Sequence, residues 1–153
     1  MANVPKSSTK IYYRKGKCEV KLENNVERAK YSLNGLTYAA LRDVGKFVCK
    51  KFRENYDAEF QKRSGKGRLA VQYWARKKDL DLQVGFKSKR GFWASFQELG
   101  TNIQTALGLL QKTVEDNTDE IVKIESQYLS ALETDNPESM IPSDDEEQGD
   151  DEA

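Results

Sequence analysis

Residues 69–86, LAVQYWARKKDLDLQVGF, contain two runs in which apolar and polar side chains alternate, separated by the charged stretch Lys77-Lys78-Asp79. The apolar positions that share one face are Leu69, Val71, Tyr73 and Ala75 in the first run, and Leu80, Leu82, Val84 and Phe86 in the second. A period of two is typical of β-strands that bury one face, and a tight turn between two such runs is typical of a hairpin. The stretch therefore predicts an antiparallel β-hairpin with one buried face.

The segment before the hairpin has the period of an α-helix. Its apolar side chains recur every three or four residues and are Leu41, Val44, Val48, Phe52, Tyr56 and Phe60. That spacing predicts an amphipathic helix over roughly 36–61, with Asn34 or Thr37 as its N-cap. The following loop, 61–67, leads from a helix into a strand, so it lacks the setting of a phosphate-binding loop.

Two further helical patterns follow the hairpin. Residues 92–100, FWASFQELG, predict one or two helical turns that end at Gly100, where a helix cap would have a positive φ. The last pattern predicts a helix at about 117–133, with a start nearer residue 111 as the alternative. Asn117 followed by Glu120 resembles a capping box at the start of that helix.

Together these patterns predict an α+β fold, in which a long helix from the N-terminal half and a C-terminal helix pack on a small antiparallel β-sheet. The predicted domain covers residues 36–133. Residues 1–35 form an N-terminal extension, in which 10–33 could form a short hairpin that turns at Gly16. Residues 134–153 are expected to be a disordered acidic tail.

The formal net charge of zero is the sum of two unlike parts. The chain has 25 basic and 25 acidic residues, but ten of the acids and none of the bases lie in residues 133–153. Residues 1–132 therefore carry a surplus of ten positive charges. A basic body suggests a partner of negative charge, which could be a nucleic acid, an acidic protein or the chain's own tail.

The composition excludes several classes of chemistry. The chain contains no histidine, so it has no imidazole base or metal ligand and no Ser-His or Cys-His nucleophile pair. Cys18 and Cys49 lie 31 residues apart, without a metal-binding spacing. We therefore expect no catalytic residues, no cofactor, no metal site and no enzymatic activity. The N-terminus lacks the pattern of a signal peptide and no apolar run has the length of a membrane span, which predicts an intracellular chain outside the membrane.

Basic residues gather around the hairpin and form a candidate interaction surface that includes a tryptophan. Its members are Trp74, Arg76, Lys77, Lys78, Lys87, Lys89 and Arg90. These bases could contact phosphates or an acidic partner, or they could be ordinary solvated loop residues. Trp74 lies opposite the buried face, so either it is exposed as an interface group or a helix covers it.

The order of features from residue 36 to 133 has a counterpart in a known family. A Gly67-Arg68-Leu69 step enters the hairpin, and the segment 92–101, FWASFQELGT, precedes the last helix. The chain thereby resembles the head–tail joining or tail-completion proteins of long-tailed bacteriophages, which typically carry TGRL before a strand and an FYARFLEFGT-like segment before the last helix. The residues that carry the resemblance are Gly67, Arg68, Leu69, Phe92, Trp93, Phe96, Glu98, Gly100 and Thr101.

The resemblance implies a non-enzymatic virion protein that acts at the neck, completing the tail or joining it to the head as part of a homo-oligomeric ring. Its implied partners are other neck, connector or tail proteins and DNA passing through the channel. Its implied location is the virion and, during assembly, the host cytoplasm. The alternative is a nucleic-acid-binding accessory protein of a phage or mobile element.

Two structural expectations concern the segment 87–101. Phe92 and Phe96 are expected to anchor it to the core. Glu98 lies close in sequence to a basic loop and is expected to pair with Arg68 or Arg90.

Overall fold

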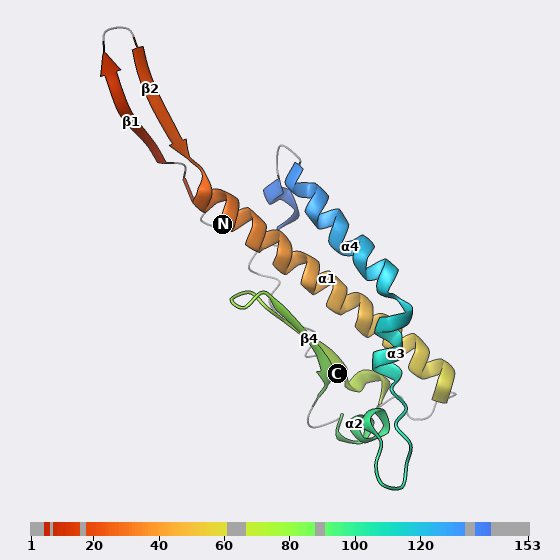
Figure 1. Ribbon diagram of the computed structural model, residues 1–153. Helices are drawn as coiled ribbons and strands as arrows, with labels where there is room; N and C mark the ends of the chain where they lie inside the picture. The colour runs from red at the N-terminus through yellow and green to blue at the C-terminus, as the bar shows by residue number, and fades with distance from the viewer. Residues whose placement is uncertain are drawn as a thin grey trace.

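The computed structural model describes residues 5–6, 8–15, 18–60, 67–87, 91–133 and 137–141, and it has an α+β fold. Figure 1 shows a long helix, α1, running through the molecule, with a β-hairpin projecting from its N-terminal end. A second hairpin and a C-terminal helix pack along α1 (Figure 1). The fold class predicted from the sequence is therefore confirmed.

Helix α1 spans Val26–Phe60 and begins well before the predicted start at residue 36. The side chain of Asn24 caps the helix, since its Oδ1 accepts a hydrogen bond from the Val26 N–H at 3.0 Å. Gly35 suggests a turn in the sequence but lies inside the helix. A Cβ atom on Gly35 would come within 2.6 Å of the Ile141 side chain, so this glycine makes room for a returning segment of the chain.

The predicted N-caps of this helix are wrong. Asn34 and Thr37 both lie within α1, and the Thr37 hydroxyl donates a hydrogen bond to the backbone oxygen of Leu33 at 2.9 Å. A hydroxyl that bonds one turn back is common inside helices and does not mark a start.

Strands β3 (Val71–Arg76) and β4 (Asp81–Phe86) form the predicted antiparallel hairpin. The cross-strand pairs on the face that packs on α1 are Val71 with Phe86, Tyr73 with Val84, and Ala75 with Leu82. This face is the one that the alternation predicts, because residues two apart on a strand share a face.

Two residues of the predicted alternation lie outside the strands. Leu69 belongs to the 3-10 turn η1 (Arg68–Ala70), where its side chain is exposed. Leu80 belongs to the turn between β3 and β4, with a φ of 51°, and its N–H donates to the Arg76 carbonyl at 2.9 Å. The turn therefore takes one residue more than the sequence suggests, which moves Leu80 out of β4.

The core lies where this hairpin meets α1. Phe52 is only 1% exposed and packs with Cys49 and Val71. The ring of Phe86 meets that of Phe52 edge-on, with centroids 5.6 Å apart. Gly45 allows the close approach of the two elements, because a Cβ atom there would lie 2.6 Å from Cδ2 of Tyr73.

Among the described residues after the hairpin are the α-helices α2 (Phe92–Leu99), α3 (Leu109–Asp116) and α4 (Thr118–Ser130). The short helix predicted at 92–100 is confirmed. The helix predicted at about 117–133 corresponds to α4. The alternative start near residue 111 falls in α3, which is a separate helix because the φ of −115° at Asn117 interrupts the helical backbone. Asn117 makes no side-chain cap, and its amide instead donates to the Thr113 carbonyl at 2.8 Å, so the predicted capping box is wrong.

Helices α3 and α4 run beside α1 and are joined to it by buried or half-buried polar contacts (Figure 1). The amide of Asn55 donates to the hydroxyl of Thr113 at 2.9 Å, and Thr113 is buried. Farther along, the Tyr128 hydroxyl donates to the carboxylate of Asp43. These contacts set the register of the C-terminal helices on α1.

The N-terminal residues form the hairpin that projects from the body in Figure 1. Strand β1 (Ser8–Lys15) pairs antiparallel with β2 (Cys18–Asn24), which confirms the strands of the predicted short hairpin. The predicted turn at Gly16 lies outside the described residues. The predicted domain boundary at residue 35 falls inside α1, because the helix continues directly from β2.

The predicted disordered tail begins too early. After the 3-10 turn η2 (Ala131–Glu133), residues Pro137–Met140 form a further 3-10 turn, η3, which contacts α1. Ile141 then lies against Gly35. The rest of the predicted acidic tail, 142–153, lies outside the described residues.

The close packing at Gly45 leads to a first prediction. Gly→Ala within a helix ordinarily stabilises by about 1 kcal/mol, but Gly45→Ala should destabilise by about 1–3 kcal/mol, because β3 must move away from α1. The control is Gly85→Ala, where the nearest atom would lie at an ordinary 3.8 Å, so little change is expected. Urea unfolding of the two variants measures both effects, and a stabilised Gly45→Ala variant would contradict this packing.

The contact between Tyr128 and Asp43 leads to a second prediction. Burial, and then the hydrogen bond and charge of Asp43, raise the pKa of Tyr128 from 10 to about 12, and Arg42 offsets part of that rise. The fold thus favours the neutral phenol, whose stabilising effect is complete below pH 10 and is lost as the pH rises to about 12.

Tyr128→Phe should therefore lower the free energy of unfolding by about 1 kcal/mol at neutral pH. The difference from the unmodified chain should shrink between pH 10 and pH 12. Denaturant titrations at several pH values measure it, and a difference that stays constant up to pH 12 would contradict the prediction.

Candidate interaction surfaces

The exposed apolar side chains of α2 form a contiguous patch, termed the aromatic surface: Phe92, Trp93, Phe96 and Leu99. The Trp93 side chain is 76% exposed and that of Leu99 is 80% exposed. The rings of Phe92 and Phe96 meet edge-on, with centroids 4.7 Å apart, and Trp93 contacts both rings. The prediction that Phe92 and Phe96 anchor the segment to the core is therefore wrong, since both are exposed.

The opposite side of α2 packs against the rest of the fold and so holds the aromatic surface in place. Ala94 is buried there, and the Ser95 hydroxyl donates to the Gly91 carbonyl at 3.1 Å. A Cβ atom on Gly91 would lie 2.5 Å from the Lys87 carbonyl oxygen, so the residue before α2 lies close against the end of β4. Small side chains lie inward and the rings lie outward, which is the reverse of an ordinary amphipathic core helix.

Glu98 connects α2 to the start of α3. Its Oε1 accepts hydrogen bonds from the N–H groups of Leu110 at 2.7 Å and Gln111 at 3.3 Å. The N-cap position of α3 is occupied by Gly108, which has no side chain to cap the helix. Glu98 supplies that acceptor from ten residues upstream, and its negative charge lies at the positive end of the helix dipole.

Of the two partners expected for Glu98, the described residues test only Arg68, and the structure does not contain that pair. Arg68 pairs instead with Asp57 at the end of α1, with Nη1 and Oδ2 2.8 Å apart. Arg90 lies outside the described residues. The carboxylate of Glu98 is used by backbone amides, a role that the charge pattern alone does not indicate.

Gly100 and Thr101 form the turn that leaves α2. Gly100 has a φ of 77° and a ψ of 170°, a region that essentially only glycine adopts. Its N–H donates to the Phe96 carbonyl at 2.9 Å. The Thr101 hydroxyl accepts from the N–H groups of Ile103 and Gln104, so it closes the next turn. The positive φ expected at residue 100 is thus confirmed.

The Gly67-Arg68-Leu69 step joins the end of α1 to β3. A Cβ atom on Gly67 would lie 2.1 Å from the Tyr56 hydroxyl oxygen, so the chain passes close to that ring. Together with the Arg68–Asp57 ion pair, this contact holds the entry to the hairpin against α1. The motif therefore has a structural role in placing the hairpin.

The predicted basic surface at the hairpin tip is partly neutralised within the chain. Arg76 pairs with Asp79 at 3.7 Å and with Asp81 at 3.2 Å. The ammonium group of Lys77 lies 6.0 Å from the centroid of the Tyr38 ring. Lys78 is exposed, whereas Lys87 is half-buried. Lys89 and Arg90 lie outside the described residues.

Trp74 projects from the outer face of the hairpin, beside Gln83 on β4. Its side chain is 45% exposed, so of the two outcomes left open by the sequence the structure has the exposed one. It lies on a different element from the aromatic surface.

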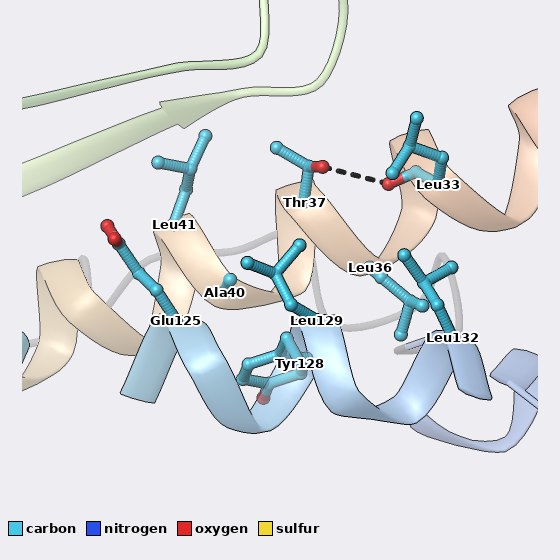
Figure 2. A pocket seen from close by; sticks show the side chains of 9 residues that line it. All are labelled: Leu33, Leu36, Thr37, Ala40, Leu41, Glu125, Tyr128, Leu129 and Leu132. Carbon is cyan, nitrogen blue, oxygen red and sulfur yellow. Dashed lines mark hydrogen bonds between the residues drawn. The ribbon is translucent and has the colours of Figure 1, made fainter. Parts of the chain in front are cut away.

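A second apolar surface lies between α1 and α4, and Figure 2 shows the side chains that line it. This groove has a volume of about 190 Å³ and is open to solvent. Its lining residues are Leu33, Leu36, Thr37, Ala40, Leu41, Glu125, Tyr128, Leu129 and Leu132. The groove is not predicted from the sequence, although apolar residues that flank the main stripe of the last helix, such as Leu129, are a signal of it.

The described residues offer few groups that could bind a metal ion or react with a substrate. No group of three or more acidic, cysteine or histidine side chains that could hold a metal ion occurs in the described part of the chain. None of the helices among these residues is long and apolar enough to cross a membrane. Burial raises the pKa of the Cys49 thiol to about 11, against a smaller opposing effect of Arg53, so this thiol stays protonated at neutral pH.

Comparison with known proteins gives no relative: no protein-family model, curated protein or solved structure matches this chain.

The turn at Gly100 leads to a third prediction. A Cβ atom at Gly100 would lie 2.7 Å from the Ala106 backbone nitrogen, in a backbone region that side chains avoid. Gly100→Ala should therefore destabilise the fold by about 1–3 kcal/mol. Gly108→Asn is the matched control, because residue 108 also has a positive φ, of 58°, but is in open space and in a region that asparagine tolerates.

Urea unfolding measures the free energy of both variants. Equal losses at the two positions would contradict the role assigned to crowding at Gly100.

Proposed function

We propose that this chain is a non-enzymatic structural protein of a long-tailed bacteriophage, which acts at the junction of head and tail by completing the tail or joining it to the head. In this proposal it works as part of a ring of identical subunits and contacts other neck or tail proteins. The aromatic surface of α2 is the observation that carries the proposal.

The first support is that the aromatic surface is built by the segment that carries the family resemblance. Phe92, Trp93 and Phe96 provide the rings. Glu98 caps α3, and Gly100 turns the chain away from α2. Each residue of this motif therefore either belongs to the exposed patch or holds it in place, which is what an interface motif requires.

The second support is the energetics of exposed aromatic side chains. Clustered rings and leucines that face solvent are unfavourable for an isolated chain, and they are typical of the buried centre of protein–protein interfaces. Tryptophan is among the residue types that contribute most to binding when a partner covers them. The 76% exposure of Trp93 therefore favours a function in assembly.

The competing hypothesis, a nucleic-acid-binding accessory protein, has weaker support. It depends on the basic residues around the hairpin, and Arg76 there is already paired with two aspartates. Phosphate binding would require those ion pairs to be replaced, which reduces the gain from each contact.

The test is the assembly of infectious particles by a phage that encodes variants of this chain. Trp93→Ala should lower the yield of complete particles at least about tenfold, with separate heads and tails accumulating, since losing a central aromatic contact reduces affinity by that order or more. Trp74→Ala removes the other exposed tryptophan and should leave assembly unchanged.

Both variants should unfold at the same denaturant concentration as the unmodified chain, which excludes misfolding as the cause. A Trp93→Ala phage that assembles normally, or a chain that is absent from purified particles and dispensable for their formation, would contradict the proposed function.

A further inference from the structure

The aromatic surface of α2 and the groove between α1 and α4 are both apolar and exposed, and they lie at different places along α1. Figure 1 shows α2 near the end of α1 where α3 lies, whereas α4 extends along α1 toward its N-terminal end. Each surface is unfavourable in water unless another apolar surface covers it. One of them can cover the other if their shapes, sizes and charges agree.

The aromatic surface has the pattern of a helix that binds in a groove. Phe92, Phe96 and Leu99 occupy positions i, i+4 and i+7 of α2, so they form one stripe along the helix, with Trp93 beside it. The stripe is about 10 Å long at the rise of an α-helix. It is a ridge, and its complement is a groove of similar length.

The groove between α1 and α4 has the shape and size to accept such a helix. Figure 2 shows its two walls, which come from α1 and α4 and carry leucines. Along α1 it runs from Leu33 to Leu41, about 12 Å, so the α2 stripe fits within it lengthwise. Its volume of about 190 Å³ exceeds the roughly 150 Å³ of a cavity that holds benzene, so an aromatic ring can enter it.

The area of the aromatic surface is that of one side of a stable interface. The exposed fractions are 76% for Trp93, 57% for Phe92 and 39% for Phe96. Since an aromatic side chain buries about 150–250 Å² when fully enclosed, the three rings offer roughly 400 Å². A standard interface removes about 800 Å² from each partner, a little over half of it apolar. The rings together with Leu99 therefore supply the apolar share of one side.

Charge does not oppose this contact. Glu98 is the charged residue in the sequence of α2, FWASFQEL, and its carboxylate accepts hydrogen bonds from the first amides of α3. The stripe itself is uncharged. It therefore brings no like charge to Glu125, the acidic residue that lines the groove.

The aromatic surface does not reach the groove of its own chain. Phe86 at the end of β4 packs on Phe52 of α1, and α2 follows β4 in the sequence. Leu41, the nearer end of the groove, lies about 16 Å from Phe52 along α1. Because Gly91 and the Glu98 contact hold α2 at its two ends, the helix would have to leave β4 and α3 to cross that distance.

We propose that the aromatic surface of one copy of this chain binds in the α1–α4 groove of a second copy, with the α2 stripe between the leucines of the two walls. The contact uses a different surface on each copy, so a pair of copies keeps one free aromatic surface and one free groove until a ring closes. It rests on the proposed function, because it is the subunit contact of the ring proposed above.

The test mixes two variants of the full chain that each lack one surface. Trp93→Ala damages the aromatic surface and keeps the groove, whereas Leu129→Glu places a charge in the groove and keeps the aromatic surface. Each variant alone should self-associate at least about tenfold more weakly than the unmodified chain in sedimentation velocity. Their equimolar mixture should form dimers and nothing larger, because one intact surface of each kind remains.

Matched controls separate this result from misfolding and from a general effect of charge. Gln127→Glu adds the same charge to α4 at an exposed position that does not line the groove, and Trp74→Ala removes the other tryptophan. Both controls should self-associate as the unmodified chain does. All four variants should unfold at the same denaturant concentration as the unmodified chain, since the four side chains are exposed.

A crosslink measures the proximity of the two surfaces directly. Two chains that both carry Cys18→Ser are mixed with a short bis-maleimide, one with Leu99→Cys and a size tag, the other with Leu129→Cys. The mixed dimer should form at least about fivefold more than when Gln127→Cys replaces Leu129→Cys, because positions 127 and 129 lie on different sides of α4. Cys49 is buried and does not react.

Three outcomes would overturn the contact. They are an unmodified chain that does not self-associate, a variant mixture that stays monomeric, and a dimer crosslinked mainly through position 99 of both copies, in which the aromatic surfaces pair with each other. None of these outcomes contradicts the proposed function, which is tested by the presence of the chain in particles. Absence of the chain from purified particles would overturn that function even where the variant mixture forms dimers.

Discussion

The packing of the β3–β4 hairpin on α1 forms the core and positions the elements that follow it. A two-stranded sheet cannot bury an apolar face by itself, so the hairpin is stable only because α1 covers it. Phe52 and Cys49 from α1 meet Val71 from β3, and Gly45 lets the Tyr73 ring come close to the helix backbone. Once the hairpin is placed, the end of β4 determines where α2 begins and therefore where the aromatic surface lies.

The segment from Phe92 to Thr101 forms the exposed aromatic surface next to the hairpin and α1. The carboxylate of Glu98 binds the first amides of α3, and Gly100 provides a backbone conformation that other residues avoid. The rings of α2 thus lie on a helix that is fixed at both ends, by Gly91 on one side and by the Glu98 contact on the other. A rigid exposed surface loses little conformational entropy on binding, which suits a contact in a permanent assembly.

Much of the fold was predictable from local patterns. The alternation is confirmed in strand pairing and in the buried face over 71–76 and 81–86, where a period of two admits only one set of inward residues, but not at Leu69 and Leu80. The positive φ of Gly100 was predictable for a similar reason, since a glycine directly after a helical pattern is the usual cap. These features depend on residues close to one another in the sequence.

The features that were not predictable depend on distant residues. Gly35 suggests a turn by itself, and only the packing of Ile141 against it explains why the helix continues through it. Glu98 suggests an ion pair, and its role as a cap depends on Gly108 lacking a side chain. The rings of Phe92 and Phe96 suggest a core contact, whereas the small residues Ala94 and Ser95 take the inward side of α2. The groove between α1 and α4 likewise requires both helices to be placed.

In the function proposed above, the aromatic surface is an interface between subunits or between this chain and a neck protein. The most direct measurement is a cryo-electron microscopy map of the particle's neck at a resolution that shows side chains. We expect Phe92, Trp93 and Leu99 to be covered by a neighbouring chain in the assembled ring. A map in which this chain is present and α2 faces solvent on all subunits would contradict the claim.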